Sequence, residues 1–273
     1  MNRSEIRAKK SLGQHFLKDK NIADKIVNAL PRKTDGIILE IGPGTGILTE
    51  ILLKQSPENY FAIEIDHDAV NYLLNNFPEL SGKLFHQDFL SYDLKQLPGE
   101  KIYIIGNFPY NISSQIFFHL LNYQENVQTV VCMLQKEVAE RICSKPNNKT
   151  YGILSVLFQI YYDIEYLFSV NETAFIPPPK VKSAVIRMQK KDVPHLNCNR
   201  ELFFKIVKSA FNQRRKTMRN SLSSYIRKDI KHDLVFNLRP EQLAPQDFIK
   251  LTNLIENQKD EFIASTGFNL EAE

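Results

Sequence analysis

Cysteine is scarce in this sequence of 273 residues, and the three cysteines that occur stand far apart. Cys132, Cys143 and Cys198 form no CxxC pair and have no cluster of histidines beside them. Zinc sites and disulfide frameworks need such groupings, so the sequence predicts neither. The expectation is free thiols in a reducing cytosol and no bound metal.

Long hydrophobic runs are absent as well. No stretch of about eighteen apolar residues occurs, and residues 1–10 are charged where a signal peptide requires an apolar core. Hydrophobic residues nevertheless make up 43% of the chain, which is ordinary for a globular protein with a sizeable core. The sequence therefore predicts a cytoplasmic protein that is not attached to a membrane.

The net charge is only +4, but the charge is unevenly distributed. Residues 200–239 contain eleven Lys or Arg against three Asp or Glu, and residues 1–33 contain nine against three. Two basic ends thus flank a more acidic middle, as a surface that binds phosphates requires. For any single basic run, a solvated helix face is the more common explanation.

Short apolar segments alternate with helical patterns over the first two thirds of the chain, which predicts a parallel sheet buried on both faces. Two later apolar runs, 164–170 and 184–188, predict strands on either side of the proline cluster 177–179. From about residue 193 onward only helical spacing occurs, for example among Leu202, Phe203 and Ile206. The earlier strands are expected at Ile37–Ile41, Tyr60–Ile65, Lys83–Asp88, Ile102–Gly106 and Val127–Leu134. The sequence therefore predicts an α/β domain over residues 1–192 and a small all-helical domain over residues 193–273.

A glycine-rich segment with the sequence EIGPGTG, residues 40–46, follows the first predicted strand. Glycines let a backbone approach a ligand closely at the carboxyl edge of an open parallel sheet. A dinucleotide-binding fingerprint would have glycine where Ile47 stands, so an NAD site is disfavoured. Glu64 and Asp88 are expected to close the next two strands, where Glu64 can accept both ribose hydroxyls of a cofactor and Asp88 its adenine amine. Either acid alone is more often a helix cap or a solvated loop residue.

The tetrapeptide Asn107-Phe108-Pro109-Tyr110 ends the fourth predicted strand. The N6 amine of adenine is a poor nucleophile because its lone pair is delocalised into the ring. The Asn107 side-chain oxygen and the Phe108 carbonyl can accept its two hydrogens and so favour a tetrahedral nitrogen, while Pro109 stiffens the turn that presents them. Tyr110 offers a ring on which a flipped-out base can stack, a contact worth about 1–3 kcal/mol. A plain strand-to-helix turn is the minor alternative. Phe175 is a candidate for the second face of an aromatic clamp, and a core phenylalanine is an equally good interpretation.

Four motifs, SLGQHFL (11–17), EIGPGTG, NFPY and FIPPPKVKS (175–183), closely resemble those of the bacterial small-subunit ribosomal RNA adenine dimethyltransferases of the KsgA type. They occur in the family's order, and the resemblance covers essentially the whole chain. It implies a Rossmann-like class I methyltransferase fold with a mostly parallel seven-stranded sheet. It also implies S-adenosylmethionine as cofactor and S-adenosylhomocysteine as product. The positions expected to contact the cofactor, with Gly44 added from the glycine turn, are His15, Leu17, Gly42, Gly44, Glu64, Asp88 and Asn107.

The resemblance implies dimethylation of two adjacent adenosines in a hairpin near the 3′ end of small-subunit rRNA, late in subunit assembly. The partner is then rRNA within an assembling small subunit, and the protein is expected to be monomeric. His15 stands where the family usually has Asn, and Phe108 where Leu is commonest. Because residues 214 and 215 cannot share one narrow helix face, one of them is expected to be structural. Cations expected to contact RNA phosphates are Lys180, Arg214, Arg215, Lys216 and Arg219.

Three other functions remain open from sequence. A large-subunit rRNA methyltransferase of the macrolide-resistance type shares the catalytic domain. A DNA adenine methyltransferase shares the logic of the tetrapeptide, although no separate segment for DNA target recognition is evident. A non-catalytic nucleic-acid-binding protein on the same scaffold is the third, and the intact Glu64, Asp88 and NFPY argue against it.

Overall fold

The computed structural model describes residues 6–55, 58–192, 196–226 and 233–266. The chain divides into two compact units, one formed by Met1–Glu140 and Tyr162–Lys191 and the other by Arg141–Tyr161 and Asp192–Glu273. The sequence interpretation placed residues 141–161 in the first domain. They belong with the helical unit because α6 (Ile153–Tyr161) packs against α7 (Arg200–Asn212) and α9 (Pro245–Thr266).

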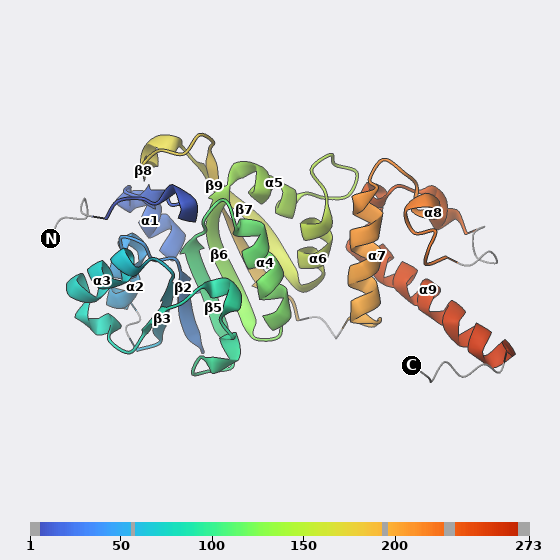
Figure 1. The fold of residues 1–273 in the computed structure, drawn as a ribbon, viewed down its shortest axis with the longest axis horizontal. Coiled ribbons are helices and arrows are strands. Elements are labelled where there is room, and N and C mark those ends of the chain that lie inside the picture. The colour runs from blue at the N-terminus through green and yellow to red at the C-terminus, as the bar shows by residue number, and fades with distance from the viewer. Residues whose placement is uncertain (1–5, 56–57, 193–195, 227–232, 267–273) are drawn as a thin grey trace. The chain divides into compact units, whose positions relative to one another are not determined.

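The first unit is built on a seven-stranded sheet with the order β4-β3-β2-β5-β6-β9-β7 (Figure 1). Its first five strands are parallel to one another, and β9 runs antiparallel to both β6 and β7. The mostly parallel seven-stranded sheet expected from the sequence is thus confirmed. The strands are β2 (Ile37–Ile41), β3 (Tyr60–Glu64), β4 (Leu84–His86), β5 (Ile102–Asn107), β6 (Val127–Gln135), β7 (Tyr162–Val170) and β9 (Ser183–Lys190).

Two helices of the first unit start at aspartates that cap them. Asp19 accepts hydrogen bonds from the backbone N–H groups of Asn21 and Ile22 and begins α1 (Lys20–Val27). Asp66 accepts from the N–H of Asp68 and begins α3 (His67–Asn76). The further helices of this part of the chain are α2 (Ile47–Gln55), α4 (Ser113–Leu120) and α5 (Lys136–Cys143), which continues into the second unit.

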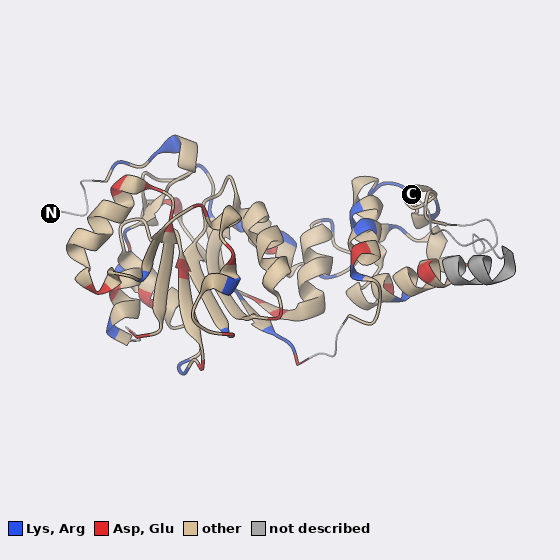
Figure 2. Ribbon diagram, turned by 60° about the horizontal axis from the view of Figure 1, so that its bottom comes forward, with Lys and Arg blue, Asp and Glu red and all other residues tan. Residues whose placement is uncertain are grey.

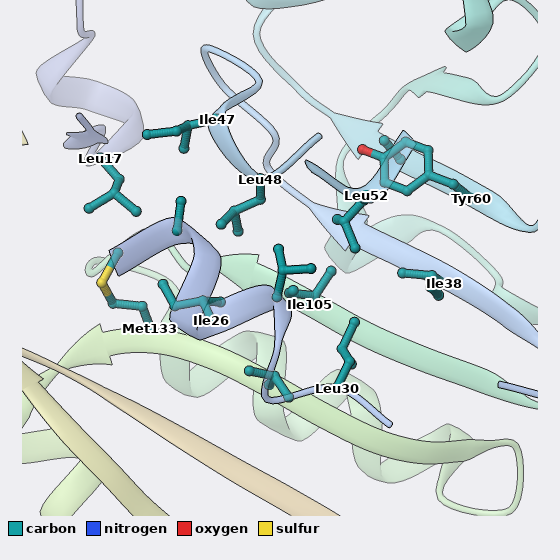
Figure 3. Close-up of a cluster of buried hydrophobic side chains, with 14 of the residues drawn as sticks. Leu17, Ile26, Leu30, Ile38, Ile47, Leu48, Leu52, Tyr60, Ile105 and Met133 are labelled. Carbon is teal, nitrogen blue, oxygen red and sulfur yellow. The ribbon is translucent and has the colours of Figure 1, made fainter. Parts of the chain in front are cut away.

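Alternate residues of the central strands form the hydrophobic core on one face of the sheet. Ile38 of β2, Ile105 of β5 and Met133 of β6 contact a cluster that includes Ile26 of α1 and Leu48 of α2 (Figure 3). Burying one such side chain stabilises the fold by roughly 1.5–3 kcal/mol. This packing fixes the relative register of the strands, and therefore the positions of the side chains at their carboxyl ends.

A second, two-stranded sheet joins distant parts of the first unit. Phe16 of β1 (Phe16–Leu17) pairs with Ile176 of β8 (Phe175–Ile176), and Leu17 pairs with Phe175. Leu17 and Phe175 are buried in the core, with 4% and 1% of their surfaces exposed. Ile176 stays largely exposed.

The third predicted strand is shorter than expected. It ends at His86, so the prediction that Asp88 closes it is wrong. The Asp88 carboxylate instead accepts from the backbone N–H of Leu90 at 2.9 Å and caps a 3₁₀ turn, Phe89–Ser91. A short acidic side chain competes with strand pairing in this way, and β4 is an edge strand with one neighbour. The second predicted strand does end at Glu64, as expected for that acid, one residue before the predicted bound Ile65.

The second unit is helical in its described parts, as the spacing after residue 193 predicts. Besides α6, α7 and α9 it contains α8 (Met218–Ser221). Phe203 and Ile206 of α7 are fully buried, as is Phe248 of α9, whose ring stacks on that of Phe211 at 5.9 Å. Among the described helices of the whole chain, none has the length and apolar character needed to cross a membrane. The 3₁₀ turns besides Phe89–Ser91 are Lys10–Leu12, Pro78–Leu80, Leu94–Gln96, Leu121–Tyr123, Glu172–Ala174, Leu234–Asn237 and Pro240–Gln242.

Candidate active site

A pocket lies at the carboxyl ends of the parallel strands β2, β3 and β5, the edge at which open α/β sheets bind their ligands. It brings together most of the residues that the sequence assigns to catalysis and cofactor binding. Its lining consists of Leu12, Gly13, Gln14, His15, Phe16, Gly42, Gly44, Glu64, Ile65, Asn107, Phe108, Pro109 and Tyr110.

The glycine turn after β2 leaves room for a ligand. Gly42 and Gly44 both have positive φ angles, 65° and 56°, which other residues rarely adopt. A Cβ atom added at Gly42 would meet nothing within 4 Å, whereas one added at Gly44 would lie 2.9 Å from the ring of Phe16. The space above Gly42 therefore belongs to the pocket, while Gly44 is required by the close approach of Phe16.

Glu64 presents a carboxylate that the backbone holds in place. Its Oε2 accepts from the N–H of Gly44 at 3.0 Å, and its Oε1 accepts from the N–H of Asp66 at 2.9 Å. Burial raises the pKa of the Glu64 carboxyl, and these backbone N–H groups counteract part of that rise. Each oxygen retains a further acceptor site, so this fixed carboxylate can still receive hydroxyl donors from a ligand.

Asn107 carries an acceptor that the protein leaves unused. Its Nδ2 donates to the backbone carbonyl of His15 at 2.8 Å, which fixes the orientation of the amide. Its Oδ1 is buried and has no hydrogen-bond partner within the described residues. An unsatisfied buried acceptor costs about 1–3 kcal/mol, so such a group marks a place where a ligand can supply the missing donor.

The next three residues shape the rest of the pocket. Phe108 is 1% exposed and its ring packs edge-on against Phe117 of α4, so the ring is not available as a stacking surface, while the residue still lines the pocket. Tyr110 is half-buried, and its ring lies 5.3 Å from that of His15 at an angle of 32°. Burial raises the pKa of the Tyr110 hydroxyl, which stays protonated at neutral pH.

Residues 9–16 cover one side of the pocket and are fastened to the start of α3. Gln14 accepts from the N–H of Lys9 and donates to Asp66, both at 2.8 Å. The Lys9 ammonium lies 2.5 Å from Asp66 and 2.7 Å from Asp68. Hydrogen bonds to these two carboxylates raise the pKa of Lys9. The His15 ring adds a bond from Nδ1 to the carbonyl of Pro177 at 2.8 Å.

Three residues that the sequence assigns to the site lie outside this pocket. Phe175 is part of the core, so the structure supports the core interpretation and corrects the one in which its ring clamps a base. The Leu17 side chain is buried in the same core, which leaves only its backbone for a cofactor. Asp88 caps its turn through one oxygen, and the other stays available.

Five lining residues were not assigned individually from sequence: Leu12, Gly13, Gln14, Phe16 and Ile65. Four of them belong to the SLGQHFL motif. Only Gly44 hints at Phe16 from the sequence. A glycine is needed where the φ angle is positive and where a neighbouring group leaves no room for a side chain, and at Gly44 that neighbour is the Phe16 ring. Ile65 follows the strand-end acid directly, and its exposure of 47% is unusual for isoleucine.

The cations expected to bind RNA differ in their surroundings. Lys180, in the first unit, and Arg215 and Lys216, in the second, are exposed. Arg214 donates to the carbonyl of Asn148 at 3.1 Å, and Arg219 donates to Asn237 at 2.8 Å. Figure 2 shows basic residues on α7 and after it. One of the arginines at 214 and 215 is thus structural, but the helix-face reasoning is wrong, because α7 ends at Asn212.

No three His, Cys, Asp or Glu side chains gather where they could hold a metal ion in the part of the chain that the structure describes. The polar groups of the pocket, a fixed carboxylate, an open glycine turn and an unused amide oxygen, fit a nucleoside-bearing ligand with hydroxyl and amino donors.

Comparison with solved structures identifies the fold. The structure resembles a dimethyladenosine transferase from Plasmodium falciparum with a TM-score of 0.77 and 24% identity, covering 90% of this chain and 98% of that one. It resembles the 23S rRNA methyltransferase ErmE with a TM-score of 0.64 and 23% identity, covering 87% and 99%. These likenesses, together with the sheet order, confirm the Rossmann-like fold of class I methyltransferases.

Comparison of sequences identifies the family. A protein named ribosomal RNA small subunit methyltransferase A from Flavobacterium johnsoniae is 53% identical over 254 residues, which are 92% of this chain and 97% of the relative. A protein of the same name from Cytophaga hutchinsonii is 50% identical over 256 residues, 93% and 99% of the two chains. The family model described as ribosomal RNA adenine dimethylase matches residues 5–260. The chain therefore belongs to the ribosomal RNA adenine dimethylase family and is an S-adenosylmethionine-dependent methyltransferase.

Proposed function

We propose that this protein dimethylates the N6 amines of two adjacent adenosines in the 3′-terminal hairpin of small-subunit rRNA, late in the assembly of that subunit. The names of the curated relatives specify the small ribosomal subunit. The observation that carries the chemistry is the buried Oδ1 of Asn107, which has no partner among the described residues and belongs to the same pocket as the Glu64 carboxylate.

Glu64, Gly42 and Asp88 are the residues that would hold the cofactor. The fixed Glu64 carboxylate would accept hydrogen bonds from the ribose hydroxyls, and the open space above Gly42 would let the backbone lie close to the ligand. The free oxygen of Asp88 accepts from the adenine amine, while Gly44, His15 and the backbone of Leu17 close the site. When bound, S-adenosylmethionine supplies a methyl group on a positively charged sulfur.

Asn107, Phe108 and Tyr110 act on the target base. In the first transfer the Asn107 Oδ1 and the Phe108 carbonyl would accept the two N6 hydrogens, which localises the lone pair on the nitrogen, and in the second transfer one of these acceptors would hold the single remaining hydrogen. The Tyr110 ring supports the flipped-out base. After transfer, the methylated nitrogen is acidic and releases its proton readily, so the chain needs no strong general base.

Exposed cations in both units would contact the RNA backbone. Lys180, Arg215 and Lys216 are free to reach phosphates, while Arg214 and Arg219 hold the basic segment in shape. We propose that the helical unit recognises rRNA and that the protein acts as a cytoplasmic monomer.

The test offers purified protein and S-adenosylmethionine to four substrates in parallel: unmodified small subunits, naked small-subunit rRNA, large subunits and DNA. The expected product is N6,N6-dimethyladenosine in the small subunits, measured by mass spectrometry of nucleosides. Asn107→Ala is expected to abolish transfer, while Asn71→Ala, on the exposed face of α3, leaves it unchanged. Activity confined to large subunits or to DNA would reject the assignment.

A further inference from the structure

Ser183 lies next to the active site without lining its pocket. It is the first residue of β9 and is fully buried. Its backbone is paired on both sides, with Gln135 of β6 and with Val170 of β7. The Ser183 hydroxyl is therefore carried by an interior strand, which is among the stiffest parts of the first unit.

This hydroxyl is hydrogen-bonded to the phenolic oxygen of Tyr110. Tyr110 itself lies in the irregular segment between β5 and α4, where neighbouring strands do not restrain it. A tyrosine side chain pivots about two torsions, and a ring that supports a base must keep its plane. The bond to Ser183 fixes the far end of the ring, while the backbone fixes the near end.

The segment that leads to Ser183 also holds the ring of His15, the neighbour of Tyr110. The carbonyl of Pro177 bonds the imidazole of His15, and the hydroxyl of Ser183 bonds Tyr110. The segment from residue 177 to residue 183 thus fastens two rings that lie 5.3 Å apart in the pocket. The FIPPPKVKS motif therefore contributes to the site through Pro177 and Ser183, although its phenylalanine is buried in the core.

We propose that Ser183 is a positioning residue for methyl transfer, because its hydroxyl holds the Tyr110 ring in the plane that supports the target base. The proposal rests on the proposed function, since it needs a base in that pocket. Ser183 does not touch the cofactor or the base and acts only through Tyr110.

The test is a double-mutant cycle. Ser183→Ala removes one end of the hydrogen bond and Tyr110→Phe removes the other end while keeping the ring. Each single variant is expected to lower kcat for small-subunit methylation about tenfold, the size of one lost hydrogen bond. The double variant is expected to be no worse than either single one. Affinity for S-adenosylhomocysteine, measured by calorimetry, is expected to stay within twofold.

Ser155→Ala is the matched control. Ser155 is also fully buried, and within the second unit its hydroxyl donates to the carbonyl of Arg141 and accepts from the N–H of Gly152. This variant therefore loses at least as much buried hydrogen bonding as Ser183→Ala but should keep the wild-type kcat. If Ser155→Ala and Ser183→Ala lowered kcat equally, Ser183 would act through stability alone. The proposal would also be overturned if the effects of Ser183→Ala and Tyr110→Phe on kcat multiplied in the double variant.

A readout without catalysis separates this proposal from the proposed function. In protein labelled with 3-fluorotyrosine, the Tyr110 resonance is the one missing from the Tyr110→Phe spectrum. Ser183→Ala is expected to shift and broaden that resonance, and an unchanged resonance would disprove the tether. If the wild-type protein methylates none of the four substrates, the proposed function fails, and the role of Ser183 in supporting a base fails with it.

Discussion

The two units treat their functional polar groups in opposite ways. In the first unit, Asn107 presents a buried acceptor without a partner, and Glu64 keeps acceptor capacity in reserve. In the second unit, Arg214 and Arg219 make hydrogen bonds within their own unit, and exposed Arg215 and Lys216 remain beside them. A site that closes around a small ligand can hold unused groups in place, whereas a surface for a polyanion relies on exposed charge.

The largest effect on ligand binding is expected at Glu64, whose carboxylate keeps unused acceptor sites. Glu64→Gln removes the charge from the contact to the ribose hydroxyls and should weaken S-adenosylhomocysteine binding about 10- to 100-fold, since charge-assisted hydrogen bonds contribute roughly 1.5–3 kcal/mol. Calorimetry measures the affinity. Glu58→Gln, at an exposed position, is the control and should bind normally. Normal binding by Glu64→Gln would remove Glu64 from the cofactor site.

A second buried acid of the same unit offers a contrast, because its acceptor capacity is engaged. Glu40 accepts from the hydroxyls of Tyr60 and Thr49 through Oε2, and burial raises its pKa from 4.5 to about 7. The folded protein therefore holds this proton more tightly than the unfolded chain does. The free energy of unfolding should fall as the pH rises from 4.5 to 7, by up to about 1.4 kcal/mol per pH unit.

Glu40→Gln should remove that part of the pH dependence while keeping an acceptor for both hydroxyls. Urea unfolding of wild type and variant at pH 5, 6, 7 and 8 measures the difference. A gap between the two proteins that stays constant across this range would show that Glu40 does not titrate there.

A smaller effect should distinguish the exposed cations of the second unit from the arginines that are hydrogen-bonded within it. Removing the exposed pair, Arg215→Ala with Lys216→Ala, should weaken binding to small-subunit rRNA about tenfold and make the log–log salt dependence shallower by about 1.5. Arg214→Ala should chiefly lower the thermal midpoint. Filter binding at several salt concentrations and thermal melts measure both. The distinction fails if Arg214→Ala changes the salt slope as much as the double variant does.

The smallest effect is expected at the fastening of the N-terminal segment. Lys9→Ala removes the ion pairs with Asp66 and Asp68, to which Lys9 contributes a partly exposed ammonium, and such pairs contribute little. Affinity for S-adenosylhomocysteine should fall about twofold at low salt and be unchanged at 0.5 M salt, where the attraction is screened. Lys20→Ala, at an exposed position of α1, is the control. A drop as large as that of Glu64→Gln would mean that the segment governs binding.

The sheet and its acid-bearing edge could be predicted because their signals are local. Buried parallel strands are continuous apolar runs, and Glu64 and Asn107 end such runs. The predicted strand end at Asp88 is wrong because the Asp88 side chain accepts a hydrogen bond from the N–H of Leu90, and the strand ends before it. The same sequence features therefore indicate the edge of the sheet but not the last residue of each strand.

Contacts between distant residues could not be predicted in this way. The pairing of Leu17 with Phe175 buries both side chains, and no sequence feature near either residue identifies the other as its partner. The bond between Tyr110 and Ser183 spans 73 residues, and Gln14 reaches Asp66 across 52. The assignment of α6 to the helical unit likewise depends on packing against α7 and α9. Family resemblance locates such motifs, but their contacts become visible only in the fold.

The position of β9 sets the order in which a nascent chain can become an enzyme. Because β9 lies between β6 and β7, β7 has no strand partner until residues 183–190 have been synthesised. The tether of Tyr110 arrives with the same segment. A ribosome that stalls before residue 183 therefore holds a chain in which β6 is an open sheet edge and the Tyr110 hydroxyl lacks Ser183, and both gaps are closed together when that last strand inserts.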